Sequence, residues 1–112
     1  MSSAELTEPV RDFVERHVAT LDHVAILLML RDQAGAADSP SALAERNRLD
    51  RSVVDRVLAD LAASGFLEQD RQSFRYAPPA ELRHAVDELA LAYRTMPVTL
   101  IRAIYARGAR QL

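Results

Sequence analysis

The stretch of residues 39–79 constrains the fold more than any other part of the chain, because its helix starts, turns and breaks follow one another in a definite order. Ser39-Pro40 is typical of a helix start. The serine side chain can accept a backbone N–H bond at the N-cap, and proline loses no donor at the first helical position. The first helix is expected over residues 40–47. Residues 47–49, Asn-Arg-Leu, then predict a tight turn.

A second helix is expected to begin after Asp50, whose side chain can cap it. It is expected to end at Gly65, because a residue with positive φ is needed there. Apolar side chains recur along this helix at intervals of three and four residues, so they share one buried face and leave the opposite face polar. The predicted buried set is Val54, Val57, Leu58 and Leu61.

Two short runs after this helix predict a β-hairpin. Residues 66–69 and 73–76 flank a polar connection at residues 70–72 that is short enough to join antiparallel strands. Pro78-Pro79 closes the sheet, because proline cannot donate a hydrogen bond to a strand ladder. Helix, turn, helix and hairpin in this order predict a mainly α (α+β) fold: a winged helix-turn-helix with additional N- and C-terminal amphipathic helices.

Several residues of this stretch carry a resemblance to a known family. They are Leu43-Ala44, Leu49 before Asp50, Arg51-Ser52-Val53-Val54, Leu58, Leu61, Ser64-Gly65-Phe66-Leu67 and Tyr76. With them, the segment resembles the winged-helix DNA-binding domains of bacterial transcription regulators, MarR-like ones in particular. The resemblance covers about forty residues directly and implies duplex DNA as the partner. In MarR-like regulators, N- and C-terminal helices of this kind join in a dimer interface.

The length of 112 residues and the 49% hydrophobic content predict one domain over residues 1–112. Within it we expect an N-terminal helix in residues 1–21, the winged helix-turn-helix in 22–79 and dimerisation helices in 80–112. All 14 basic residues are arginine, which is typical of a GC-rich bacterial genome.

The chemistry-bearing residues do not predict catalysis. The chain has no cysteine, its histidines (His17, His23, His84) lack ligand spacing, and no catalytic or phosphate-loop motif is present. We therefore expect no enzyme activity, no metal and no cofactor; whether an effector binds is left open. The longest apolar run, residues 24–30, is too short to cross a bilayer, and residues 1–9 do not resemble a signal peptide, so we expect a cytoplasmic protein.

The region before the helix-turn-helix predicts a central core helix. Asp22 can cap a helix over residues 23–33 that is apolar nearly all round, and such a helix is buried on most sides. A loop then leads into Ser39, and Asp38 in this loop is expected to be solvated.

Amphipathic helices are expected on both sides of this core. One starts near Thr7, one covers residues 80–95, and another covers residues 98–105 after an interruption at Pro97. Their apolar stripes exceed what a monomer of this size usually hides, which predicts a homodimer. The expected interface is Val10, Phe13, Val14, Leu89, Tyr93, Leu100, Ile101, Ile104 and Tyr105.

The polar face of the second helix and the hairpin tip form the predicted DNA-binding site. Arginine can bond guanine O6 and N7, and serine can bond a base or a phosphate. Arg71 at the hairpin tip is suited to a phosphate contact. The full predicted set is Arg48, Arg51, Ser52, Asp55, Arg56, Arg71, Gln72 and Arg75.

Charge balance keeps a second interpretation open. The formal net charge is −2 and no block of the chain is strongly basic, so bulk electrostatics gives little help to DNA binding. The same helix face can instead be laced by the pairs Arg51–Asp55 and Arg56–Asp60, and Arg75 can pair with Glu68 across the strands. The alternative function is a winged-helix module for protein–protein interaction without a specific DNA target.

Overall fold

The computed structural model describes residues 5–33 and 35–110, and its backbone contacts divide the chain into two compact units. One unit contains three helices, α1 (Glu8–His17), α5 (Ala80–Thr95) and α6 (Pro97–Arg110). The other unit spans residues 22–79. The single-domain organisation over the whole chain stays a prediction.

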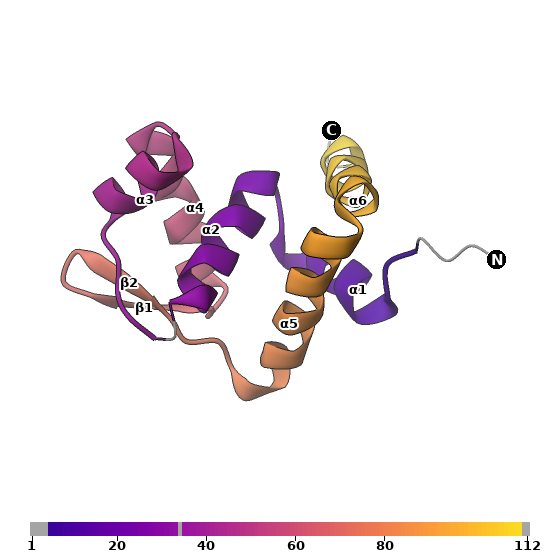
Figure 1. The fold of residues 1–112 in the computed structure, drawn as a ribbon, viewed down its shortest axis with the longest axis horizontal. Coiled ribbons are helices and arrows are strands. Elements are labelled where there is room, and N and C mark those ends of the chain that lie inside the picture. Colours follow the sequence, from indigo (N-terminus) through magenta and orange to yellow (C-terminus); the bar gives the residue numbers. More distant parts are fainter. Residues whose placement is uncertain (1–4, 34, 111–112) are drawn as a thin grey trace. The chain divides into compact units, whose positions relative to one another are not determined.

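The unit of residues 22–79 has the expected winged helix-turn-helix order (Figure 1). Its elements are α2 (Leu21–Asp32), α3 (Pro40–Asn47), α4 (Arg51–Ala63), β1 (Leu67–Asp70) and β2 (Ser73–Tyr76). α3 packs against α4, and α4 packs against β1. The strands are antiparallel, with Leu67 opposite Tyr76 and Asp70 opposite Ser73. The predicted fold class is confirmed.

Local sequence chemistry explains where these helices begin and end. Ser39 Oγ accepts a hydrogen bond from the Ala42 amide at 3.1 Å, which caps α3. At the end of α4, Gly65 has φ +89°. The Phe66 amide donates to the Leu61 carbonyl and the Gly65 amide donates to the Ala62 carbonyl, both at 3.0 Å. This pair of bonds satisfies carbonyls that the helix end leaves free.

Three predictions about element ends were wrong in detail. Asp50 has the extended backbone of an N-cap, but its carboxylate makes no cap hydrogen bond. α2 begins at Leu21, so Asp22 lies inside its first turn rather than capping it. Asp70 pairs with Ser73 as a strand residue, which shortens the hairpin turn from residues 70–72 to residues 71–72.

The predicted apolar face of α4 is buried. Exposed fractions are 0% for Val54, 2% for Val57 and 1% for both Leu58 and Leu61. The core of this unit also contains Val24, Ile26, Leu27, Leu30, Leu43 and Phe66, each fully buried. Because these side chains fix the rotation of α4 about its axis, the polar residues of the helix are directed to the surface.

Replacing Leu58 with alanine should lower the free energy of unfolding by about 2–5 kcal/mol, because the substitution leaves a cavity among buried side chains. Urea unfolding followed by circular dichroism measures this loss. Leu91→Ala is the matched control, because Leu91 is 50% exposed, and it should change stability by less than about 0.5 kcal/mol. Equal losses in the two variants would contradict the assignment of Leu58 to the core.

The unit formed by α1, α5 and α6 has its own apolar interior. α1 packs against both other helices, and α5 packs against α6. The Thr7 hydroxyl caps α1 by accepting from the Val10 amide at 3.4 Å, and Arg107 Nε donates to the Glu15 carbonyl at 2.8 Å. Pro97 starts a new helix, as expected from its missing N–H. In the described part of the chain, no helix has the length and apolar content that crossing a bilayer requires.

His17 lies at the end of α1 in a half-buried position, with its ring centroid 5.2 Å from that of Phe13. Burial lowers the pKa of His17 below its ordinary value, and the nearby charges of Arg16 and Arg107 add to this effect. Asp12 acts in the opposite direction. The folded state therefore favours the neutral imidazole.

Stability should consequently fall as the pH is lowered through about 6.5, where His17 takes up a proton in the unfolded chain but not yet in the folded one. The difference in unfolding free energy between the wild type and His17→Gln, measured by urea unfolding from pH 7.5 to pH 5, should reveal this contribution. His84→Gln, which removes an exposed histidine of α5, should leave the fall at low pH in place. Parallel profiles for wild type and His17→Gln would contradict the assignment.

Candidate nucleic-acid interface

The outward face of α4 presents the four helix residues predicted to contact DNA. Arg51, Ser52, Asp55 and Arg56 are all exposed. Their position follows from the buried stripe on the opposite side of the helix. A helix face of this kind, with two guanidinium groups and a hydroxyl near the helix N-terminus, matches the donors and acceptors displayed in a major groove.

Arg51 is held by two neighbours. Its Nε donates to Asp55 Oδ1 at 3.0 Å along the helix, and its Nη1 donates to Ser41 Oγ at 2.9 Å on α3. The Arg51–Asp55 pair is therefore formed, as the solvated-face interpretation expected. The bond to Ser41 was missed, because nothing in the sequence joins residues ten positions apart across a turn. Arg51 thus connects α3 to α4 while remaining exposed.

Arg56 has a different environment. The expected Arg56–Asp60 pair does not form, since Asp60 Oδ2 lies 2.9 Å from His23 Nε2. His23 is a buried residue of α2 with an exposed fraction of 3%, so Asp60 is drawn toward the core helix. Within the described residues, the Arg56 guanidinium makes no hydrogen bond or ion pair. Its donors are available to an external partner.

Arg48 lies in the turn between α3 and α4 with an unusual backbone. Its φ of +55° and ψ of +46° place it in the left-handed region, where glycine or asparagine is more usual. Its amide closes the end of α3 by donating to the Ala44 and Glu45 carbonyls. The exposed side chain puts a cation just before the first turn of α4.

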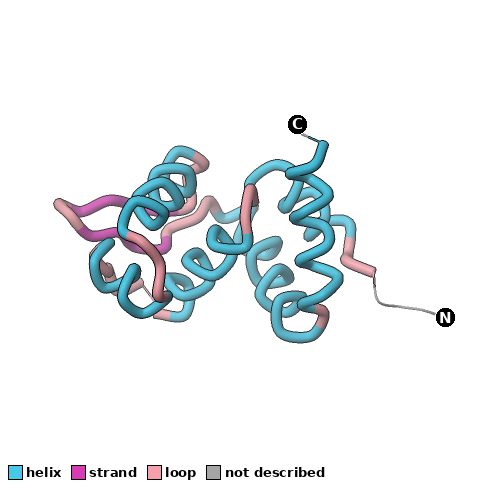
Figure 2. Tube along the Cα trace, turned by 90° about the horizontal axis from the view of Figure 1, so that it is seen from above, coloured by secondary structure: helices cyan, strands magenta, loops and turns pink. Residues whose placement is uncertain are grey.

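The hairpin places two of its predicted contact residues at the turn. Figure 2 shows the strands in magenta, with the turn at the free end of the hairpin. Arg71 and Gln72 form that turn and are both exposed, and Arg71 has φ +61°. Gln69 Nε2 donates to the Arg71 carbonyl at 3.0 Å, which supports the turn. Arg75 pairs instead with Glu68 on the opposite strand. Within the part of the chain that the structure describes, the Arg71 guanidinium has no hydrogen-bond or ion-pair partner.

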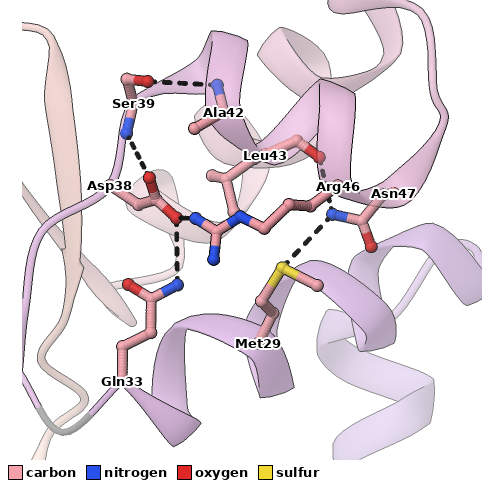
Figure 3. A network of polar contacts seen from close by, with 8 residues as sticks. All are labelled: Met29, Gln33, Asp38, Ser39, Ala42, Leu43, Arg46 and Asn47. Carbon is pink, nitrogen blue, oxygen red and sulfur yellow. Dashed lines mark hydrogen bonds and ion pairs between the residues drawn. The ribbon is translucent and has the colours of Figure 1, made fainter.

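Asp38 was expected to be solvated, and that expectation was wrong. Its side chain is only 12% exposed, because donors from three directions surround the carboxylate (Figure 3). Oδ1 accepts from the Ser39 amide at 3.0 Å, and Oδ2 accepts from Gln33 Nε2 at 3.0 Å and pairs with Arg46. A loop aspartate gives no local signal of such burial.

The predicted dimer residues fall into two groups. Most are buried within the chain itself, with exposed fractions of 3% or less. This group is Val10, Phe13, Val14, Leu89, Leu100 and Ile104. Tyr93 and Tyr105 are exposed, at 38% and 69%, and Ile101 is intermediate. Val98, at 60%, and Leu91, at 50%, are further exposed apolar residues that were not in the predicted set.

Metal sites and small-molecule sites place definite requirements on the described residues. No group of three or more histidine, cysteine, aspartate or glutamate side chains among them lies close enough together to hold a metal ion. A hollow beside α1 and α5, lined by Phe13, His17, Leu82 and neighbouring residues, has a volume of about 130 Å³. Small-molecule sites usually measure about 300–1,000 Å³, so this hollow is too small to indicate an effector site.

A family model for the IclR helix-turn-helix domain matches residues 24–71, which extend from α2 through α3 and α4 to the turn of the hairpin. No curated protein and no solved structure matches the chain. The match supports the helix-turn-helix prediction directly, while the more specific MarR-like resemblance is not confirmed by it. The helix-turn-helix of residues 24–71 is therefore similar to the IclR helix-turn-helix domain.

Proposed function

We propose that the protein is a transcription regulator that binds duplex DNA as a homodimer, with α4 of each protomer in a major groove. The observation that carries the proposal is the exposed face of α4, on which Ser52 and the unpaired Arg56 lie opposite a fully buried stripe. The IclR-type match of residues 24–71 supports the DNA-binding part. In a symmetric dimer, two such helices would enter successive grooves about 34 Å apart.

The contact residues divide into two roles in this proposal. Arg56 and Ser52 read base edges, because their donors are exposed on α4. Arg48, in the turn before α4, and Arg71, in the hairpin turn, contact phosphates. Arg51 orients the start of α4 through Ser41 and keeps its remaining N–H donors for DNA. Gln72 at the tip adds a polar contact, while Arg75 lies farther along β2, paired with Glu68.

Contacts of the aspartates on α4 reduce the repulsion between these acids and DNA phosphates that the sequence suggested. Asp55 is paired with Arg51, which offsets its charge, and Asp60 is held by a hydrogen bond to His23 and so does not pair with Arg56. Arg48 and Arg56 therefore act as uncompensated cations at short range, which is the distance at which phosphate contacts operate at physiological salt. A net charge of −2 still predicts weak binding to nonspecific DNA.

The dimer part of the proposal rests on α6. Val98 and Tyr105 are seven positions apart, so they lie on one side of the helix, with the half-buried Ile101 between them. Exposed apolar stripes of this kind mark self-association surfaces. The MarR-like resemblance, in which terminal helices form the dimer, agrees with this placement.

Selection of binding sites from random duplexes tests the function as a whole. A homodimer that reads bases should enrich an inverted repeat, because protein symmetry is mirrored in the site. Binding of the enriched site should depend on salt with a slope of log K against log salt of about −4 to −5, for about four to six neutralised phosphates per dimer. No enriched motif would instead favour the protein-interaction module.

Two arginine variants should then separate the two roles. Arg71→Ala should weaken all duplexes similarly and flatten the salt slope by about 1 for each lost phosphate contact. Arg56→Ala should cost about 1–3 kcal/mol on the preferred site and relax its base preference. Fluorescence anisotropy on the selected site and a scrambled site measures both effects.

The control for these variants is Arg94→Ala, which removes an exposed arginine of α5 outside the residues 22–79. It makes the same change in net charge and should leave both the affinity and the slope within about twofold of the wild type. If Arg94→Ala weakened binding as much as Arg56→Ala, a general charge effect would replace the proposed base contact.

Self-association should be lost when the α6 stripe is charged. Tyr105→Asp and Val98→Asp each place a carboxylate on an exposed apolar position, where burial against a second copy would cost several kcal/mol. Sedimentation equilibrium should show a dimer for the wild type and a monomer for either variant at tens of micromolar. Ala106→Asp, on another side of the same helix, should remain dimeric. A monomeric wild type would remove the dimer proposal.

A further inference from the structure

We propose that Asp38 is a positioning residue that fixes the hairpin on the helix-turn-helix and so sets where Arg71 meets DNA. The part of this inference that concerns DNA rests on the function proposed above. The part that concerns the hairpin stands on the geometry of residues 22–79 alone. Asp38 has no place in the predicted DNA-contact set, and its position in a loop between helices gives no hint of such a role.

The backbone of Asp38 extends the sheet by one residue. Its amide donates to the Phe74 carbonyl at 2.9 Å, and its carbonyl accepts from the Phe74 amide at 2.8 Å. This isolated antiparallel bridge lies on the side of β2 that β1 does not occupy. Phe74 is three residues from Arg71 along the strand. A shift at this bridge would therefore be carried directly to the tip of the hairpin.

The carboxylate of Asp38 determines where that backbone lies. Oδ1 accepts from the Ser39 amide, and Oδ2 accepts from Gln33 Nε2 at the end of α2 and pairs with Arg46 on α3 (Figure 3). A carboxylate that is only 12% exposed and has donors on both oxygens is confined to one orientation, because losing any donor leaves its charge poorly solvated. Helices α2 and α3 and strand β2 are thus tied to a single residue.

The neighbouring contacts support the same arrangement. Asn47 on α3 donates to the Leu43 carbonyl at 2.7 Å and to Met29 Sδ on α2 at 3.5 Å (Figure 3). The bond to Met29 is a second link between α2 and α3, beside the one through Asp38. The hairpin, in contrast, is a pair of four-residue strands, and two-stranded hairpins are marginally stable alone. Through its bridge to Phe74, Asp38 links strand β2 of the hairpin to helices α2 and α3.

The substitution Asp38→Asn tests this role with little change of shape. An asparagine can keep its oxygen toward the Ser39 amide, but its NH₂ group then faces Arg46, which can only donate. The Gln33 amide can rotate to offer Oε1, so the lost contact is the one to Arg46. The matched control is Asp32→Asn, which removes the same charge from an exposed carboxylate at the end of α2. Arg46→Gln removes the partner and serves as the second variant should Asp38→Asn fail to fold.

Amide hydrogen exchange measures the hairpin without DNA. The Phe74 amide should exchange about tenfold faster in Asp38→Asn than in wild type, while the Leu58 amide in α4 should change by less than about twofold. Asp32→Asn should leave both amides unchanged. Unchanged exchange of the Phe74 amide in both Asp38→Asn and Arg46→Gln would overturn the positioning role. Equal acceleration at Phe74 and Leu58 would also overturn it, because it would indicate a global loss of stability.

A double-mutant cycle on DNA measures the consequence for Arg71. Asp38→Asn should weaken the selected site by about fivefold without changing the preferred sequence, and it should have less than about twofold effect once Arg71 is alanine. Additive effects would overturn the link to Arg71, because they would mean that Asp38 acts elsewhere. If the wild type binds no DNA, the proposed function fails, whereas the exchange experiment still decides the role of Asp38 in the hairpin.

Discussion

The burial of one face of α4 is the constraint on which the candidate interface depends. Val54, Val57, Leu58 and Leu61 are all 2% exposed or less, and rotating the helix by even a fraction of a turn would bring some of them to water. Burial of side chains of this size is worth about 1.5–3 kcal/mol each. The direction in which the exposed polar residues of α4 point is therefore not set by those residues themselves. Packing of the buried face fixes the rotation of α4, and this rotation decides which polar side chains are exposed.

Ion pairs then decide which of the exposed charges remain available. In the sequence, α4 contains two arginines, each followed four positions later by an aspartate. The pairs Arg51–Asp55 and Arg56–Asp60 are therefore equally favourable by spacing alone. The buried His23 draws Asp60 away, so Arg56 stays unpaired while Arg51 is held by Asp55 and Ser41. A single histidine on the core helix thus distinguishes two arginines that the sequence treats alike.

The turn before α4 and the hairpin turn carry further contact residues, and each contains an arginine with positive φ. Arg48 at +55° and Arg71 at +61° occupy a region that costs a non-glycine residue about 1 kcal/mol or more. Glycine is the residue that relieves this cost, and Gly65 does so at the end of α4. Arginine at the other two positions keeps a cation at an exposed turn despite the strain, which agrees with a role on the surface rather than in packing.

Residue patterns alone determined the fold class, the order of the elements and most of their ends, because capping, helical spacing and positive φ are local properties of a few adjacent residues. Ser39 capped its helix and Gly65 ended the next, while the spacing of Leu58 and its neighbours predicted the core face. Only the tertiary structure decided what surrounds Asp38, which partner Asp60 takes and which terminal-helix residues stay exposed. Each of these depends on segments far apart in the chain, such as Asp38 with Phe74 or His23 with Asp60, and hydrogen bonding and burial at that distance leave no periodic signal in the sequence.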